Sequence, residues 1–255
     1  MENFDFYISS NGYLVIPEYD IRYLINLSES NIPSMPEATE STVRIAGRDG
    51  DIVLNTTYEP LSFEIVCYTD DDLEPLEKLE EERKINRFLN SIKQTTKTFA
   101  NEREGKFYNV KYSGLITTVR FPRHLQFTIP FKSSSSYAMN LIKSEIEGNG
   151  TAESETIEET GAIFTIKGPA QTPKISLNDY EMFYNNTLLE GHTLEINSRN
   201  STITHINETT GVKTNAMRYY NHEFPKIKNG INELKVLSGI DNEKQVKVEW
   251  YDLKL

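Results

Sequence analysis

Hydrophobic and polar residues alternate in short runs through the first half of the chain, and this alternation predicts β-strands. In 125–131 every second residue is apolar, and 61–67 repeats the pattern with Cys67 on the apolar side. A period of two puts alternate side chains on one face of a strand, so one face of each run is predicted to be buried. Cys67 is therefore predicted to be a core residue rather than a nucleophile. Further strands are predicted at 4–8, 13–16, 21–27, 43–45, 107–112 and 115–119.

One segment has helical spacing instead. The three aspartates at 70–72 precede it and are predicted to cap it, and Pro75 falls in its first turn. The pattern predicts a single amphipathic helix that packs one face against the core, in preference to a groove for a partner. Its apolar positions are Leu73, Leu76, Leu79, Ile85, Phe88, Leu89 and Ile92.

The second half of the chain has short β-rich runs separated by Asn, Gly, Asp and Pro at intervals of about ten residues. This punctuation is typical of a β-sandwich or jelly roll. The serine tract 133–136 is predicted to end a first domain at 1–136, with a linker at 137–160 and a second domain at 161–255. The strands are predicted at 163–166, 174–177, 181–184, 193–196, 202–206, 234–237 and 246–253.

Composition narrows the classes of protein that fit. The 255 residues contain one cysteine, so a disulfide scaffold and a multi-cysteine zinc module are excluded. The net charge of −11 disfavours a general nucleic-acid binder. No apolar run is long enough for a transmembrane helix, and the first residues lack the basic and apolar regions of a signal peptide. We expect a protein made in the cytoplasm, without membrane insertion.

No constellation of catalytic residues stands out. The four histidines lack metal-ligand spacing, and there is no nucleophile elbow, phosphate loop or dinucleotide fingerprint. The sequence therefore predicts no catalytic residues, no cofactor and no metal, and favours a structural or binding protein over an enzyme. Carboxylates are abundant, but abundance does not indicate a glycosidase pair. The aromatic residues that could stack on sugar rings in the second domain are Tyr180, Phe183, Tyr184 and Trp250.

The order of elements carries a resemblance to a known family. A turn at 45–50 (Ile-Ala-Gly-Arg-Asp-Gly) precedes the strand at 61–68 and the helix at 72–92, and Thr172-Pro173 opens the second domain. In this order and spacing the sequence resembles the distal tail protein (Dit) of long-tailed phages that infect Gram-positive bacteria. It departs from the family's polar-Pro-Tyr join, because 131–137 reads Phe-Lys-Ser-Ser-Ser-Ser-Tyr. The residues that match the family's structural turns are Gly47, Arg48, Asp49, Gly50, Phe224, Pro225, Gly230 and Asn232.

The resemblance implies a mainly β protein with two domains. The N-terminal domain would be a β-sandwich or split-barrel-like domain with one helix, and the C-terminal domain a jelly-roll-like β-sandwich. It implies a non-enzymatic virion protein at the distal end of the phage tail, where six copies form a ring around a channel. The partners implied are the tail tube, the tape-measure protein, a tail-tip or tail-associated lysin protein, and receptor-binding proteins.

Two further hypotheses follow. The polar segment 28–41, with the adjacent strand at Val43, is a candidate for an extended arm that pairs with a neighbouring subunit. The alternative function is that of a carbohydrate-binding protein that recognises cell-wall sugars through its C-terminal domain. The chain has little room for the inserted sugar-binding module that longer family members carry.

Overall fold

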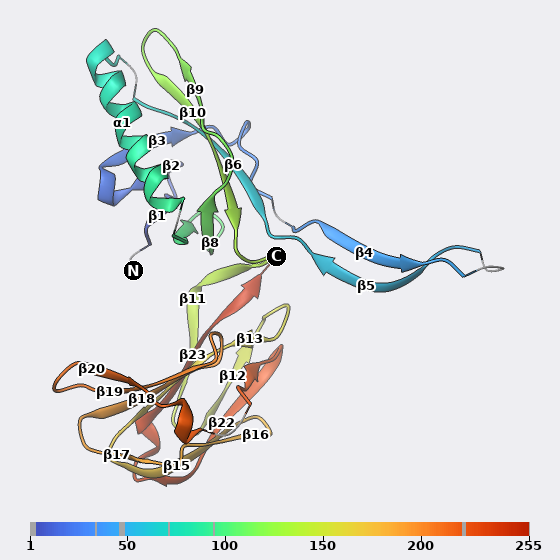
Figure 1. Cartoon of the computed structure of the whole chain (residues 1–255), viewed down its shortest axis with the longest axis vertical. Coiled ribbons are helices and arrows are strands. Elements are labelled where there is room, and N and C mark those ends of the chain that lie inside the picture. The colour runs from blue at the N-terminus through green and yellow to red at the C-terminus, as the bar shows by residue number, and fades with distance from the viewer. Residues whose placement is uncertain are drawn as a thin grey trace. The chain divides into compact units, whose positions relative to one another are not determined.

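The computed structural model describes residues 4–33, 35–45, 49–70, 72–93, 95–220 and 223–254. The chain divides into two compact units, with the division after Leu141. Both units are built almost entirely of β-strands, which confirms the mainly β class (Figure 1).

The first unit contains a closed barrel. Among the described residues, seven strands pair in the order β8-β7-β1-β2-β3-β6-β10, and β10 then pairs with β8 to close the circle. All neighbours are antiparallel except β1 and β7, which are parallel with Phe6 opposite Phe99. The strands are β1 (Phe6–Ile8), β2 (Tyr13–Ile16), β3 (Ile21–Ile25), β6 (Ser62–Tyr68), β7 (Lys97–Asn101), β8 (Lys106–Tyr112) and β10 (Leu125–Ser133). A 3-10 turn, Pro17–Tyr19, joins β2 to β3.

Phenylalanine rings fill the barrel interior. Phe6 lies with its ring centroid 5.0 Å from that of Phe99 and 5.2 Å from that of Phe131, and all three side chains are buried. Cys67 is also fully buried, as predicted, and burial raises the pKa of its thiol. The alternating run at 125–131 is β10, whose apolar residues all point into this core.

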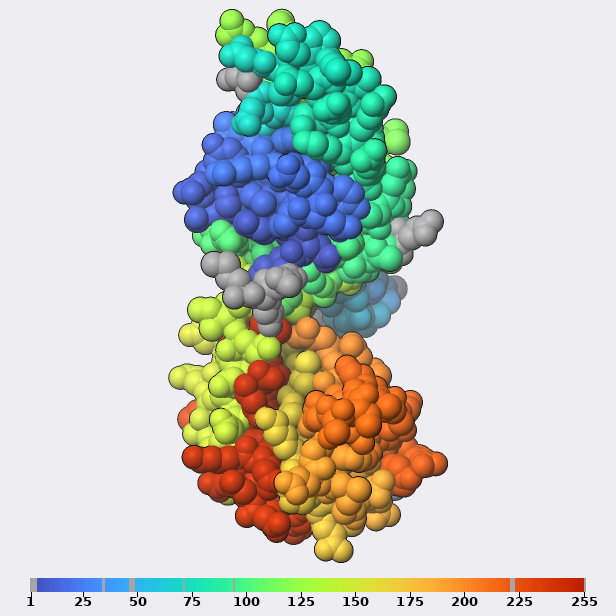
Figure 2. Space-filling model, turned by 90° about the vertical axis from the view of Figure 1, so that its left-hand side faces the viewer, coloured from blue at the N-terminus to red at the C-terminus, as the bar shows by residue number. Residues whose placement is uncertain are grey.

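A single helix, α1 (Pro75–Ile92), covers the barrel with its C-terminal half. Ile85, Phe88, Leu89 and Ile92 are buried, whereas Leu76 and Leu79 are 67% and 43% exposed. Leu79 precedes Ile85 by six residues, or about 240° around a helix, so the first leucines lie on a different face. The prediction of one continuous apolar stripe was therefore wrong. Figure 2 shows the outer surface of the helix in teal beside the N-terminal strands in blue.

The helix also begins later than the aspartates suggested. Its N-cap is Glu74, whose backbone N–H donates to Oε2 of Glu77 at 2.8 Å. Asp72 instead pairs with Arg123, at 3.2 Å between Oδ1 and Nε. Lys78 donates to the backbone oxygens of Phe121 and Pro122, which ties the exposed half of the helix to the hairpin of β9 (Thr117–Arg120) and β10.

The second unit is a sandwich of two sheets with a shared core. One sheet runs β20-β19-β18-β14-β23, and the other runs β12-β22-β15-β16 with β17 beside β15. Trp250, Phe164 and Leu234 are buried in the core that both sheets contribute to. The strands are β12 (Gly150–Ser154), β14 (Ile163–Lys167), β15 (Ala170–Leu177), β16 (Tyr180–Phe183), β17 (Thr187–Leu188), β18 (His192–Asn197), β19 (Thr202–Asn207), β20 (Val212–Asn215), β22 (Gly230–Ile240) and β23 (Val246–Lys254). A small pair of β13 (Thr160–Gly161) and β21 (Lys226–Ile227) and the 3-10 turns Met217–Tyr219 and Glu243–Gln245 complete the unit.

The segment predicted to be a linker is built differently. Residues 137–160 contain β11 (Ala138–Glu147), β12 and the first residue of β13, and the division between the units falls inside β11. Ser133 is the last residue of β10, so the serine tract is a turn within the first unit. β12 is an edge strand that buries only Ser154, and few apolar positions reveal such a strand in the sequence. Asp252 fixes this region, accepting hydrogen bonds from Ser154 Oγ and Trp250 Nε1.

Candidate functional site

The most exposed element of the first unit is a two-stranded hairpin. β4 (Ala38–Val43) and β5 (Ile52–Tyr58) pair only with each other, and we call this hairpin the arm (Figure 1). At its base, the backbone N–H of Glu59 donates to the carbonyl of Glu37 at 2.8 Å. Ser136 Oγ also donates to the carbonyl of Tyr58 at 2.7 Å. The arm is thus anchored to the barrel at its base alone among the described residues.

Aliphatic side chains gather in the distal half of the arm. Val43, Ile45, Val53 and Leu54 are 43% to 64% exposed, whereas the proximal half carries mainly Thr, Ser, Glu and Asn. Within the part of the chain that the structure describes, no further strand pairs with either long edge of the arm. Free edges with apolar side chains favour pairing with another strand, so they are ready for a partner.

Four of the predicted turn residues are at 47–50 in the sequence, and the structure describes Asp49 and Gly50 among them. Gly47 and Arg48 lie outside the described residues. Asp49 and Gly50 are exposed and lead into β5, and Gly50 has a φ of +82°, in the left-handed region that favours glycine. Strand β5 itself was not predicted, although Ile-Val-Leu followed by Asn-Thr-Thr at 52–57 is a β-prone run that indicates it.

The other four predicted residues surround one turn of the second unit. Asn232 is fully buried, and its side-chain amide donates to the carbonyls of Lys228 at 2.8 Å and Gly230 at 3.1 Å. Its oxygen accepts from the backbone N–H of Lys228 and from the side chain of Asn178. Gly230 has a φ of +90°, which the turn requires. Asn232 therefore clamps the turn that follows Phe224 and Pro225.

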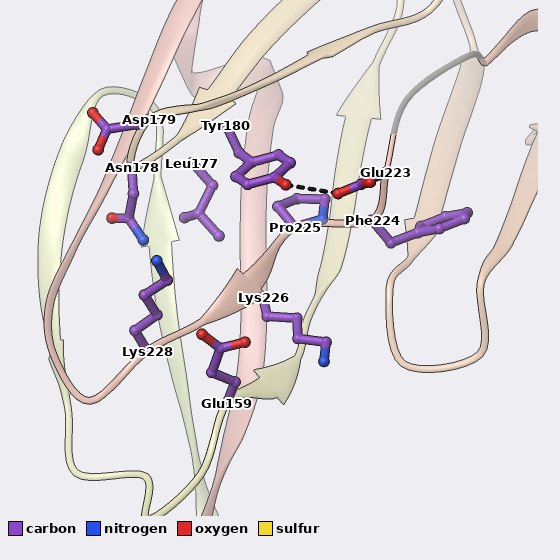
Figure 3. Close-up of a pocket in the computed structure, with 10 residues that line it drawn as sticks. All are labelled: Glu159, Leu177, Asn178, Asp179, Tyr180, Glu223, Phe224, Pro225, Lys226 and Lys228. Atoms are coloured by element: carbon purple, nitrogen blue, oxygen red, sulfur yellow. Dashed lines mark hydrogen bonds between the residues drawn. The ribbon is translucent and has the colours of Figure 1, made fainter.

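Phe224 and Pro225 line a pocket of about 410 Å³ in the same unit (Figure 3). Tyr180 also lines it, and its hydroxyl donates to Oε2 of Glu223 at 2.6 Å, which raises the pKa of Tyr180. The remaining lining residues are Glu159, Leu177, Asn178, Asp179, Lys226 and Lys228.

Burial separates the aromatic residues that were candidates for sugar stacking. Trp250 and Tyr184 are 1% and 2% exposed and belong to the core, so neither ring is accessible. Phe183 is half-buried. Tyr180 is 46% exposed and lies in the pocket, which leaves it as the accessible ring of the four.

Among the described residues, no three His, Cys, Asp or Glu side chains cluster closely enough to hold a metal ion. Within the same residues, no helix has the length and apolar character that crossing a bilayer requires.

A pair of histidines lies on β18 and β19 in the second unit. His192 Nδ1 lies 2.8 Å from His205 Nε2, a hydrogen bond that needs at least one neutral ring. Burial, and then the proximity of His192, hold the pKa of His205 below its ordinary value of 6.5. Because the folded-state pKa is the lower one, stability from neutral His205 is complete above pH 6.5 and is lost as the pH falls through the folded-state pKa.

We therefore expect urea unfolding, followed by the fluorescence of Trp250, to give a lower stability at pH 5.5 than at pH 7.5. His205→Gln is expected to reduce this difference by under about 1 kcal/mol, because the site is only partly buried. An unchanged difference in the variant would show that His205 does not contribute to it.

Comparisons with known proteins find one matching protein family and several solved structures of similar fold. Residues 19–133, which include most of the barrel, match the family described as "Phage tail protein RIFT-related domain". No curated protein sequence matches the chain.

Solved structures resemble the fold over both units. The SPP1 Dit (gp 19.1) protein, described as a paradigm of the hub adsorption apparatus in phages that infect Gram-positive bacteria, aligns with a TM-score of 0.66 at 12% identity, covering 91% of this chain and 94% of that chain. The baseplate of phage P2 in its activated conformation with Ca aligns with a TM-score of 0.55 at 9% identity, covering 91% of this chain and 90% of that chain. Residues 19–133 thus match a phage tail protein family over somewhat less than half of the chain, and the chain has the fold of the SPP1 Dit protein.

Proposed function

We propose that the chain is a structural protein of the phage tail, a hub at its distal end, where six copies form a closed ring. The phage tail domain at 19–133 and the likeness of both units to a hub protein and a baseplate support this role. The protein acts by assembly rather than by catalysis.

The observation that carries the proposal is the arm. Its edges lack partners within the described residues, and its distal half exposes aliphatic side chains. When the arm of each copy adds to a sheet edge of the next, the contact is head-to-tail, and six such contacts close a ring. Of the segment 28–41 that was the candidate for the arm, only 38–41 belongs to the hairpin of β4 and β5, because Ser30 and Asn31 bond to the backbone of β6.

We expect the arm of one copy to add to the free edge of β9 in the next copy. This strand pairs with β10 on one side only, and all four of its residues are exposed. Main-chain hydrogen bonds along such an edge would supply the contact. They must outweigh repulsion, because six copies at −11 each carry about −66 in one ring.

The remaining partners belong to the same proposal. A hub of this kind joins the tail tube and the tape-measure protein on one side to a tail-tip or tail-associated lysin protein on the other. Receptor-binding proteins would attach at its periphery. Such contacts place the protein in the virion tail.

The direct test is the mass of the purified full chain, measured by light scattering after gel filtration, together with negative-stain images. We expect a species of six chains and ring-shaped particles. A chain that remains monomeric even when mixed with its tail-tube protein would contradict the ring.

A further inference from the structure

The pocket in the second unit has an apolar floor and a polar rim. Leu177 from the end of β15, Tyr180 from the start of β16 and Pro225 from the turn before β21 make the floor (Figure 3). Leu177 and Pro225 are buried, whereas Tyr180 keeps 46% of its surface exposed. A ligand in the pocket would therefore meet the exposed ring of Tyr180 over a largely buried apolar floor.

The rim offers hydrogen-bonding groups of both kinds. Glu159 and Asp179 supply carboxylate oxygens, which only accept hydrogen bonds when ionised, and Lys226 and Lys228 supply ammonium groups, which only donate. Glu159 lies near enough to Tyr180 for its charge to raise the pKa of that phenol. Because charges of both signs surround a small volume, the rim does not suit a polyanion or an aliphatic chain.

The walls are fixed before any ligand arrives. Asn178 joins the β15–β16 turn to β22 through its backbone N–H and its side-chain oxygen, which bond the backbone of Glu233 at 2.7 and 2.9 Å. The clamp made by Asn232 holds the opposite turn, which carries Lys228 and follows directly on Lys226 in β21. A preformed site loses less conformational entropy on binding.

We propose that this pocket binds a saccharide of one or two rings. A sugar has an apolar face of C–H groups and hydroxyls that both donate and accept, and this matches an exposed tyrosine surrounded by carboxylates and ammonium groups. The sugar stacks on Tyr180, its hydroxyls donate to Glu159, and they accept from Lys226 or Lys228. A volume of about 410 Å³ fits one or two rings. This activity goes beyond the role as a hub and does not depend on it.

The test uses the full chain and a defined panel of probes: glucose, galactose, N-acetylglucosamine, N-acetylgalactosamine and the β-1,4-linked disaccharides of glucose and of N-acetylglucosamine. Saturation-transfer NMR identifies a binder, and calorimetry gives its dissociation constant. For so small a site we expect a dissociation constant of about 1 mM. Tyr180→Ala is expected to weaken binding about tenfold, because the stacking surface is lost. Tyr180→Phe keeps the ring and is expected to retain binding, and Glu159→Gln is expected to weaken it severalfold.

Matched controls separate the pocket from the rest of the surface. Glu153→Gln removes a similar exposed carboxylate on β12, and Tyr58→Ala removes an exposed tyrosine from the arm, and neither is expected to change binding. The near-ultraviolet circular dichroism of Trp250 confirms that each variant is folded. If no sugar of the panel binds, or if binding survives both Tyr180→Ala and Glu159→Gln, the proposal is wrong. Capture of a peptide by the pocket without any sugar binding would also overturn it.

Discussion

Removing the arm is expected to convert the ring into monomers without unfolding either unit. Residues 38–58 can be excised and the ends rejoined by a short glycine linker, because the Glu59 N–H and the Glu37 carbonyl are already 2.8 Å apart. The barrel retains its core, since no described residue of β4 or β5 belongs to it. Light scattering should then give the mass of one chain, while the circular dichroism spectrum should keep its β signal.

The control for this deletion is the removal of exposed turn residues from the second unit. Shortening the turn at 208–211 between β19 and β20 removes exposed residues of the second unit and should leave the ring intact. Within the arm, Leu54→Glu is expected to weaken assembly strongly and Thr57→Glu much less, because only Leu54 belongs to the aliphatic distal half. A deletion variant that still forms rings would show that the arm does not hold the subunits together.

Replacing Asn232 by alanine is expected to be among the most destabilising single changes in the second unit. The change removes four hydrogen bonds and leaves the backbone of Lys228 and the carbonyl of Gly230 without their partner. Buried polar groups that lose their partners cost about 1–3 kcal/mol each, and local relaxation recovers part of this, so we expect a loss of about 3 kcal/mol. Urea unfolding followed by the fluorescence of Trp250, which lies in the same unit, measures it.

Asn185→Ala is the matched control, because Asn185 is exposed and its removal should change stability by less than about 0.5 kcal/mol. Asn232→Asp keeps the oxygen but cannot donate to the two carbonyls, so we expect it to be nearly as destabilising as alanine. A loss for Asn232→Ala no larger than that of the control would mean that the turn is held by other contacts.

Local patterns predicted much of the fold. The strict alternation at 125–131 belongs to β10, and the last two turns of α1 were readable because their apolar residues follow the period of one helix face. β12 and β20 escaped prediction because they bury few apolar side chains and lie at an edge, so no alternation marks them. β7 was also not predicted, although it buries Phe99 and Ala100, because it is short and its buried residues do not alternate. Closure of the barrel was also beyond local reasoning, because the paired residues of β1 and β7, such as Phe6 and Phe99, are 93 positions apart in the sequence and the strands are parallel.

The candidate sites, like the fold, were only partly predictable from the sequence. The resemblance singled out Asn232 and Gly230, but only the structure shows that a buried side chain clamps a left-handed turn. Tyr180 and Trp250 are equivalent in the sequence, and burial alone makes one a surface for ligands and the other a core residue. The arm was anticipated as a polar segment, whereas its distal half is aliphatic, because the run that follows Gly50 was not assigned to a strand.

The closure of the barrel sets an order of events during synthesis. The arm is complete once residue 58 has been made, but the strand that closes the barrel ends only at Ser133. An emerging chain therefore presents the free edges and aliphatic end of the arm before the barrel exists. Unpaired edges on nascent chains invite pairing with neighbours on the same messenger RNA, and long-range closure is slow. We expect the polar proximal half of the arm to limit such premature contacts until the receiving edge of a folded barrel is available.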